Sequence, residues 1–112
     1  MGGFILHVIF SHFAFAIPSE RILETDLLLA FYHPSPSYPL HILIVPKAKI
    51  KSLSDLNFTH QAFMIGLFEA VGDLVEKFDL RSVGYRLIVN GGQYQNVDHL
   101  HFHLISEDFS DQ

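Results

Sequence analysis

The stretch that decides the fold of this chain is Gln95-Asn96-Val97-Asp98-His99-Leu100-His101-Phe102-His103-Leu104-Ile105. Histidine occupies every odd position from 99 to 103, and a large apolar residue occupies every even position from 100 to 104. Side chains of an extended strand alternate between its two faces, so this period of two predicts a strand over residues 99–105. The three imidazoles then share one face, and the apolar side chains share the other face, against the core.

Composition limits the classes of protein to which the chain can belong. It has 112 residues, 49% hydrophobic and 17% charged, which fits one folded domain with a single core and excludes a disordered chain. Cysteine is absent, so disulfides, a thiolate nucleophile and a cysteine zinc site are excluded. The formal net charge of -5 argues against general binding of nucleic acids, because such binding needs Lys and Arg to neutralise phosphates.

The N-terminal segment is the one candidate for a targeting signal. Residues 4–17 are mostly apolar, but His7, Ser11 and His12 interrupt the run and no Lys or Arg precedes it. The run is also too short and too polar to span a bilayer. We therefore expect residues 1–16 to pack on a single domain of residues 1–112, with 106–112 as a short C-terminal tail. A cytoplasmic location is the expectation, and a secretory signal is the alternative.

The remaining pattern predicts strands around one main helix, and hence an α+β domain. The predicted strands cover residues 21–24, 27–32, 41–45, 84–90 and 99–105. Thr25 and Asp26 form the turn of a hairpin between the first two strands. Three prolines between residues 33 and 39 predict a loop of fixed shape.

The main helix is predicted over residues 59–78. Thr59 can cap it, and Phe58 and Phe63 stand at the two positions of a hydrophobic staple. Apolar residues at spacings of three and four form one stripe, which we interpret as core. The stripe consists of Met64, Leu67, Phe68, Val71, Leu74, Val75 and Phe78, and the solvent side carries Glu69, Asp73 and Glu76.

Two functional interpretations of the histidine strand compete with simple decoration of a polar sheet face. Histidines two residues apart on a strand can share a metal, with zinc–nitrogen bonds of about 2.0–2.1 Å. His99 and His103 begin roughly 13 Å apart, so a metal would need two of the three histidines with Glu107 or Asp108, or with His41. Alternatively, a neutral imidazole attacks through one nitrogen while an acceptor holds the proton of the other. We favour this second interpretation, because a central histidine flanked by two others suits attack on phosphorus.

Residues 99–105 resemble the His-φ-His-φ-His-φ-φ signature, where φ is apolar, of the histidine-triad (HIT) nucleotide hydrolases and transferases. The resemblance extends over residues 17–105, with several motifs in order. The first motifs are Ile-Pro-Ser at 17–19, Glu-Thr-Asp at 24–26 and Ala-Phe at 30–31. Pro36 and Pro39 then precede His-Ile-Leu-Ile-Val-Pro-Lys at 41–47. The last two are the strand 85–90, which ends in Asn90, and Gln-Asn-Val-Asp at 95–98.

The resemblance implies an antiparallel sheet of about five strands with one main helix, dimerising into a continuous sheet. It also implies that His101 is the nucleophile, which attacks the α-phosphorus and forms a nucleotidyl-imidazole. The other ring nitrogen of His101 would be held by the backbone carbonyl of His99. His103, Gln95 and Asn90 match positions that contact the phosphate or the leaving group.

Further positions follow from the same resemblance. His41 matches a histidine that buttresses the triad, and Phe31, with Phe10 as a second candidate, would line an apolar pocket for the base. Two positions depart from the family. His33 stands where an acidic residue or Asn often accepts from the ribose hydroxyls, and a histidine has at most one acceptor nitrogen. Asn96 stands where one branch has a hydroxyl that contacts phosphate.

We therefore expect a hydrolase of nucleotide phosphoramidates or dinucleoside polyphosphates that works through a nucleotidyl-histidine intermediate on His101. Its partners would be a purine nucleotide or nucleotide conjugate and a second copy of the chain, with no nucleic acid, membrane, metal or cofactor. The alternatives are a nucleotide-binding or regulatory module of the same fold with little turnover, and a two-histidine metal protein built on His99 and His101.

Overall fold

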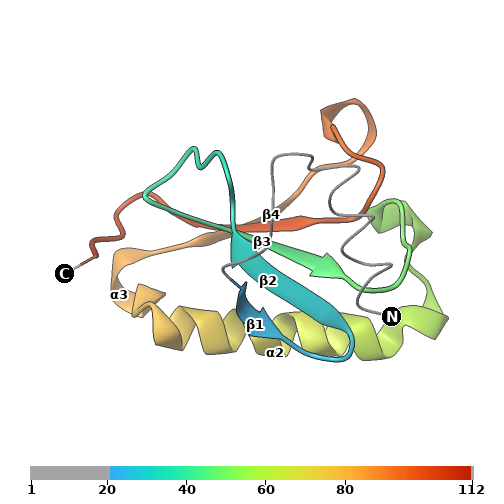
Figure 1. Cartoon of the computed structure of the whole chain (residues 1–112), viewed down its shortest axis with the longest axis horizontal. Helices are drawn as coiled ribbons and strands as arrows, with labels where there is room; N and C mark the ends of the chain where they lie inside the picture. Colours follow the sequence, from blue (N-terminus) through green and yellow to red (C-terminus); the bar gives the residue numbers. More distant parts are fainter. Residues whose placement is uncertain (1–20, 112) are drawn as a thin grey trace.

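The computed structural model describes residues 21–111, which form an α+β domain. Five strands make one antiparallel sheet in the order β1-β2-β3-β5-β4 (Figure 1). The strands are β1 (Arg21–Glu24), β2 (Leu28–Tyr32), β3 (Leu40–Pro46), β4 (Arg86–Val89) and β5 (Phe102–Ser106). The helices are α2 (Gln61–Lys77) and the short α3 (Leu80–Val83), with single 3-10 turns η1 (Leu53–Asp55), η2 (Phe58–His60) and η3 (Gly92–Tyr94). The predicted five-stranded antiparallel sheet with one main helix is confirmed.

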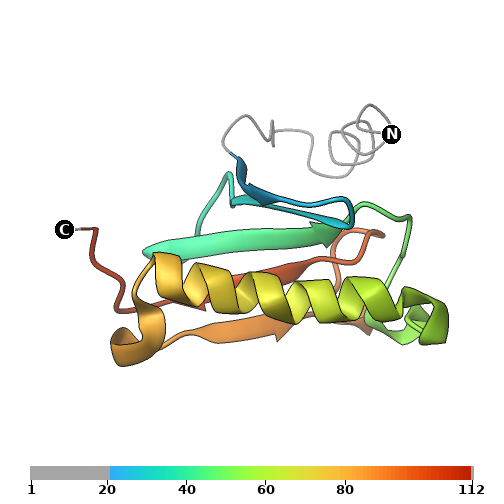
Figure 2. The ribbon, with the colours of Figure 1, turned by 90° about the horizontal axis from the view of Figure 1, so that it is seen from below.

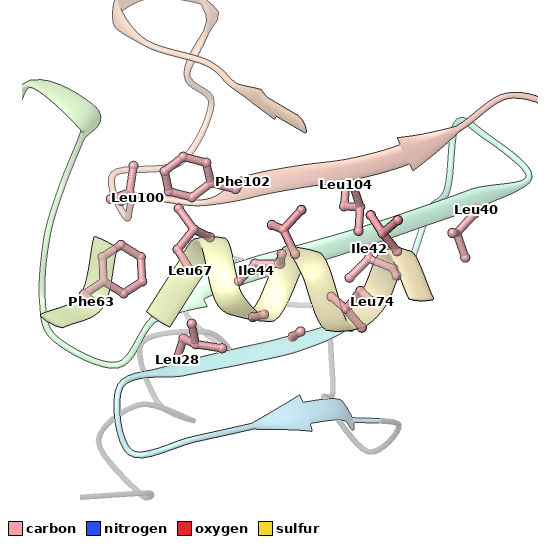
Figure 3. Close-up of a cluster of buried hydrophobic side chains, with 14 of the residues drawn as sticks. Leu28, Leu40, Ile42, Ile44, Phe63, Leu67, Leu74, Leu100, Phe102 and Leu104 are labelled. Carbon is pink, nitrogen blue, oxygen red and sulfur yellow. The ribbon is translucent and has the colours of Figure 1, made fainter. Parts of the chain in front are cut away.

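Helix α2 lies along one face of the sheet and closes the main core (Figures 1 and 2). The helical and strand periodicities each place one set of apolar side chains on this shared face. Figure 3 shows the layer, with Leu67 and Leu74 of α2 against Ile42, Ile44 and Leu104 of the sheet. Each of these side chains is at most 2% exposed, and burial of one such side chain stabilises the fold by about 1.5–3 kcal/mol.

The opposite face of the sheet carries a second apolar cluster. Strands β2 and β3 contribute Leu29, Phe31, Leu43 and Val45, which are all buried, and Val97 packs against them. The apolar run of β2 is therefore buried on both faces, which explains why its sequence does not alternate between apolar and polar residues.

The N-terminal end of the main helix differs from the prediction. Asn57 caps the first turn instead of Thr59, because its side chain accepts from the backbone N–H of Thr59 at 2.9 Å and His60 completes a capping box. The turn η2 precedes α2 and moves the cap two residues upstream, which removes Phe58 from the staple position. Phe58 is 82% exposed, so the predicted staple with Phe63 is wrong.

The predicted apolar stripe of α2 is wrong at one position. Phe68 is 65% exposed, because Leu67 points into the core and the next residue lies about 100° further around the helix axis. Ile65 is also exposed, at 55%. These two side chains are three residues apart, so α2 presents a small apolar patch away from the core.

Strand β5 begins at Phe102, three residues later than predicted. The neighbouring strand β3 ends at Pro46, which lacks the backbone N–H that a longer ladder would need. Leu100 instead donates its N–H to the carbonyl of Ile50 in the following loop, at 2.8 Å. His99 therefore lies in a bend outside the strand, which corrects the prediction of one continuous histidine strand.

Two other strands start later than predicted, and β3 is one residue longer at each end. Strand β2 starts one residue later, because Thr25 Oγ1 accepts from the N–H groups of Leu27 and Leu28 and lengthens the turn. Strand β4 starts at Arg86, since Gly84 has a φ of 98°, which no strand residue adopts.

The predictions for residues 1–16, and the candidate Phe10, lie outside the described residues. Within residues 21–111, no helix has the length and apolar character needed to cross a membrane.

Candidate active site

The histidines meet on the sheet face opposite α2, where β3 and β5 lie side by side. The antiparallel register pairs His103 with Leu43 and Ile105 with His41, so His41 is the diagonal neighbour of His103 on one face. The ring centroids of His41 and His103 lie 5.1 Å apart, and those of His101 and His103 lie 5.2 Å apart. Strand pairing thus brings to the triad a histidine that is 62 residues away in the sequence.

The ring of His101 has a defined proton position. Its Nδ1 lies 2.8 Å from the backbone carbonyl oxygen of His99. A carbonyl oxygen only accepts, so Nδ1 carries the proton and Nε2 carries the lone pair. A neutral imidazole in this state can act as a nucleophile or a metal ligand through Nε2. This is the backbone contact that the family resemblance implied.

The ring of His99 faces the end of β3. Its Nε2 lies 3.1 Å from the carbonyl oxygen of Pro46, so Nε2 donates to this oxygen, and the residue is 2% exposed. The side chain of His99 therefore fixes the backbone whose carbonyl oxygen holds His101.

Hydrogen bonds also assign the protons of His41 and His103. The backbone N–H of Ser37 donates to Nδ1 of His41 at 3.1 Å, so the proton of neutral His41 is on Nε2. This Nε2 donates to Nδ1 of His103 at 2.9 Å. The proton of His103 is then on Nε2, a buried atom without a hydrogen-bond partner among the described residues. A buried N–H with no acceptor is costly, so this atom is suited to an oxygen of a ligand.

His33 follows β2 and stacks on this pair of histidines. Its ring centroid lies 4.2 Å from that of His41, with an interplanar angle of 28°, and 6.1 Å from that of His103. The backbone N–H of Ser35 donates to Nδ1 of His33 at 2.9 Å. The acceptor nitrogen of the neutral ring is therefore already in use, and its Nε2 carries the proton. As a result, His33 reproduces poorly the hydroxyl acceptor that the family often has at this position.

Burial favours the neutral form of these imidazoles near pH 7. Burial, with smaller contributions from repulsion by His33 and His103, lowers the pKa of His41 to about 4. Burial, followed by repulsion from His101 and His33, lowers the pKa of His103 to about 4. Burial also lowers the pKa of His33, with a smaller contribution from His101. The cluster therefore acts through N–H donors and lone pairs rather than through positive charge.

Three other predicted site residues differ in their exposure to solvent. Phe31 is 2% exposed and belongs to the apolar group on the same sheet face as the histidines. Asn90 follows β4 and is half-buried, whereas Asn96 is exposed in the loop before the triad. Of the three, Asn90 and Asn96 present polar side chains that water or a ligand can reach.

Gln95 is engaged within the loop that carries it. Its Nε2 donates to the carbonyl oxygen of Lys51 at 2.6 Å and to that of Val97 at 2.9 Å. Both amide hydrogens are therefore used to brace the loop before β5. In this conformation Gln95 has no side-chain donor left for the phosphate contact that the resemblance implied.

Sequence reasoning missed two backbone groups of the site. The N–H of Ser37 sets the proton position of His41, and the carbonyl of Pro46 holds His99. Every residue carries such main-chain groups, so no residue type marks them in a sequence. The one available signal was the proline-rich loop over residues 33–39, whose fixed shape positions the N–H of Ser37.

Comparison with known proteins identifies the family of the chain. A family model described as the HIT domain matches residues 14–110. The chain belongs to the HIT family. The matched span includes all five strands, α2 and the three alternating histidines at 99, 101 and 103.

Relatives and solved structures agree with the HIT assignment. An uncharacterized HIT-like protein of Helicobacter pylori is 36% identical over 94 residues, which are 82% of this chain and 88% of that protein. The purine nucleoside phosphoramidase of Escherichia coli is 34% identical over 91 residues, covering 80% of this chain and 76% of that enzyme.

Two solved HIT structures superpose closely. A HIT family hydrolase from Legionella pneumophila has a TM-score of 0.75 and 32% identity, covering 80% of this chain and 82% of that one. A histidine triad protein from Clostridium difficile has a TM-score of 0.76 and 31% identity, covering 86% of this chain and 85% of that one. Together these relatives support hydrolase activity in general for this HIT protein.

Proposed function

We propose that this HIT protein hydrolyses the phosphoramidate or phosphoanhydride bond of a nucleotide through a nucleotidyl-histidine intermediate on His101. The proposal is based on the positions of the protons on two neighbouring imidazole rings. The lone pair of His101 is on Nε2, and the adjacent His103 has a buried Nε2–H without a partner within residues 21–111. Nucleophilic attack on phosphorus needs both a lone pair and a donor for the charge that develops on oxygen.

In the first step, the Nε2 lone pair of His101 forms a bond to phosphorus as the bond to the leaving group breaks; a leaving amine takes up one proton from solvent, and a leaving phosphate departs as the anion. The ring gains positive charge, which the hydrogen bond from Nδ1 to the carbonyl oxygen of His99 stabilises. In the second step, water attacks the same phosphorus and the nitrogen–phosphorus bond breaks. The nucleoside monophosphate leaves with one proton of the water released to solvent, and His101 returns to its neutral state.

His103 and His41 support this reaction without leaving their neutral states. The Nε2–H of His103 donates a hydrogen bond to a phosphoryl oxygen or to the leaving atom. His41 fixes the orientation of the His103 ring, because the Nε2–H of His41 donates a hydrogen bond to Nδ1 of His103. The N–H of Ser37 in turn fixes His41. This chain of hydrogen bonds keeps the donor oriented before substrate arrives, which lowers the cost of reorganisation in the transition state.

The proposed substrate is a purine nucleotide joined to an amine. The relative from Escherichia coli is named a purine nucleoside phosphoramidase, which supports both the base and the bond. Phe31 supplies apolar surface for the base on the face that carries the histidines. Asn90 and Asn96 are the candidates to contact the phosphate or the leaving group.

Turnover assays test this proposal. We expect wild-type protein to release AMP from adenosine 5′-phosphoramidate faster than from a diadenosine polyphosphate, and faster than from the uridine analogue. Rapid quenching followed by mass spectrometry should reveal an acid-labile nucleotidyl adduct on the peptide that contains His101. Absence of AMP release from both classes of substrate, with the protein folded, would contradict the proposal.

A nucleotide-binding module with little turnover is the second candidate. One observation favours it, because the acceptor nitrogen of His33 is engaged by Ser35 at the position where the family often binds ribose. The same assay separates the two candidates. Saturable binding of AMP without hydrolysis of any of these substrates would favour the module.

We also propose that the chain forms a homodimer. Strand β4 pairs only with β5 among the described strands and leaves one edge of the sheet open, and α2 presents exposed Ile65 and Phe68. Sedimentation should give twice the chain mass for the wild type and a lower mass for Ile65→Lys. The control Phe58→Lys, which changes an exposed residue outside α2, should remain dimeric. A wild type that sediments as a monomer at micromolar concentration would contradict the dimer.

A further inference from the structure

Three imidazoles from separate parts of the fold converge beside the triad. One ring nitrogen of each of His33, His41 and His103 lies within 4.8 Å of the corresponding atoms of the other two. His33 comes from the loop after β2, His41 from β3 and His103 from β5. Their convergence depends on strand register and on a histidine at the position where the family often has an acidic residue or Asn. It differs from the pair His99 and His101 that the sequence suggested for a metal.

The spacing of these nitrogens is close to that of ligands on one metal ion. Nε2 of His41 and Nδ1 of His103 lie 2.9 Å apart. Two nitrogens at about 2.0–2.1 Å from a tetrahedral zinc ion are about 3.3–3.4 Å apart. A shift of about half an ångström, achieved by small ring rotations, would therefore admit an ion between them. The loop that carries His33 can supply the third ligand.

We propose that His33, His41 and His103 bind one transition-metal dication of the zinc class, with water in the fourth position. Three neutral imidazoles form a ligand set that zinc, nickel and copper favour over magnesium or calcium. The site lies beside the nucleophile and shares only His103 with the triad.

The hydrogen bonds of the cluster show which ring nitrogens are ready to bind an ion and which must first be released. Nδ1 of His103 already carries a lone pair directed at this space. His41 must move its proton from Nε2 to Nδ1, which displaces the N–H of Ser37. His33 must either bind through Nδ1 or move its proton there, and in both cases the N–H of Ser35, which is exposed, loses its acceptor to water. Ser37 is exposed in its loop, so water can satisfy the N–H that is released.

The site is also accessible to an ion. A cavity of about 480 Å³ opens at His33 and His41, and Asp111 contributes to its lining. The carboxylate of Asp111 and the formal net charge of -5 both favour the approach of a cation. An entry path of this kind is one of the checks that a proposed metal site has to meet.

This inference has a consequence that rests on the proposed hydrolase function. An ion on Nδ1 of His103 replaces the hydrogen bond from His41 and rotates the ring whose Nε2–H would contact substrate. We therefore expect the bound ion to inhibit hydrolysis reversibly. The metal site would thus give the enzyme a sensitivity to transition metals that a family member with an Asn at position 33 would lack.

The binding test needs no substrate. Chelator-treated protein is titrated with Zn²⁺ in competition with a chromophoric chelator, and with Co²⁺ while visible absorption is recorded. We expect one ion per chain, the intense bands of tetrahedral cobalt, and loss of roughly 100-fold or more in affinity for His33→Asn. This estimate exceeds the 10–100-fold loss that removing only an outer partner of a ligand typically causes. The control His60→Asn, which changes a histidine outside the cluster, should bind like the wild type.

A second measurement uses the wild type, so its result does not depend on whether a variant folds. Nitrogen chemical shifts of the histidine rings should change on Zn²⁺ addition for His33, His41 and His103, and not for His60. Failure of wild type to bind Zn²⁺, or equal affinity in His33→Asn, would overturn the site. Binding by a protein that hydrolyses no nucleotide would support the site while contradicting the proposed function. Hydrolysis unaffected by saturating Zn²⁺ would overturn the inhibitory role.

Discussion

Replacing His101 with alanine should lower the turnover of adenosine 5′-phosphoramidate by roughly 10³-fold or more, the largest effect on activity that we expect. The substitution removes the lone pair that attacks phosphorus, which the hydrogen bond from Nδ1 to the carbonyl oxygen of His99 places on Nε2 of His101. The donor Nε2–H of His103 remains, so AMP should still bind. Initial rates at saturating substrate and mass spectrometry after a quench measure the loss of turnover and of the nucleotidyl adduct.

The matched control for this experiment is His60→Ala. His60 belongs to the capping box before α2 and lies outside the imidazole cluster, so its loss removes one exposed hydrogen bond, worth about 0.5–1.5 kcal/mol, and leaves the site intact. We expect the control to retain a rate close to that of the wild type. If folded His101→Ala retained a rate within tenfold of the wild type, His101 would be excluded as the nucleophile.

The alternation of residues 100–105 was sufficient to predict which side chains of β5 face the core. Leu104 is fully buried against α2, and His103 lies on the other face, because a period of two depends only on the strand itself. The start of the strand was not predictable in this way. It depends on Pro46, which ends the neighbouring strand and leaves His99 in a bend.

The contacts among the histidines depend on tertiary register, which local sequence patterns do not contain. His41 reaches His103 because β3 and β5 pair with Leu43 opposite His103. The family resemblance supplied His41 as a buttress, but the stacking of His33 on its ring follows from the shape of the loop over residues 33–39. Gln95 shows the same limit, since its loop contacts come from the distant carbonyl of Lys51 as well as from Val97.

Exposure on α2 was mispredicted for a related reason. A spacing of three or four admits a wide stripe, and Phe68 lies at its margin, where the width of the sheet decides whether the side chain is covered. The residue proves to be exposed, and the same exposure supports the proposed dimer.

Replacing Leu104 with alanine should lower the free energy of unfolding by about 2–5 kcal/mol, the largest effect on stability that we expect. Leu104 is fully buried in the layer between β5 and α2, so the smaller side chain leaves a cavity in addition to losing apolar burial (Figure 3). Leu104 and His103 are neighbours on β5 and point to opposite faces of the sheet. The packing of Leu104 against α2 therefore also holds in place the strand that carries the Nε2–H donor of His103. Urea unfolding measures the change, with Leu53→Ala as the control, because Leu53 is 46% exposed and its loss should cost about 0.5 kcal/mol or less. If Leu104→Ala lost no more stability than this control, the buried layer between α2 and β5 would not be a main source of the stability of the fold.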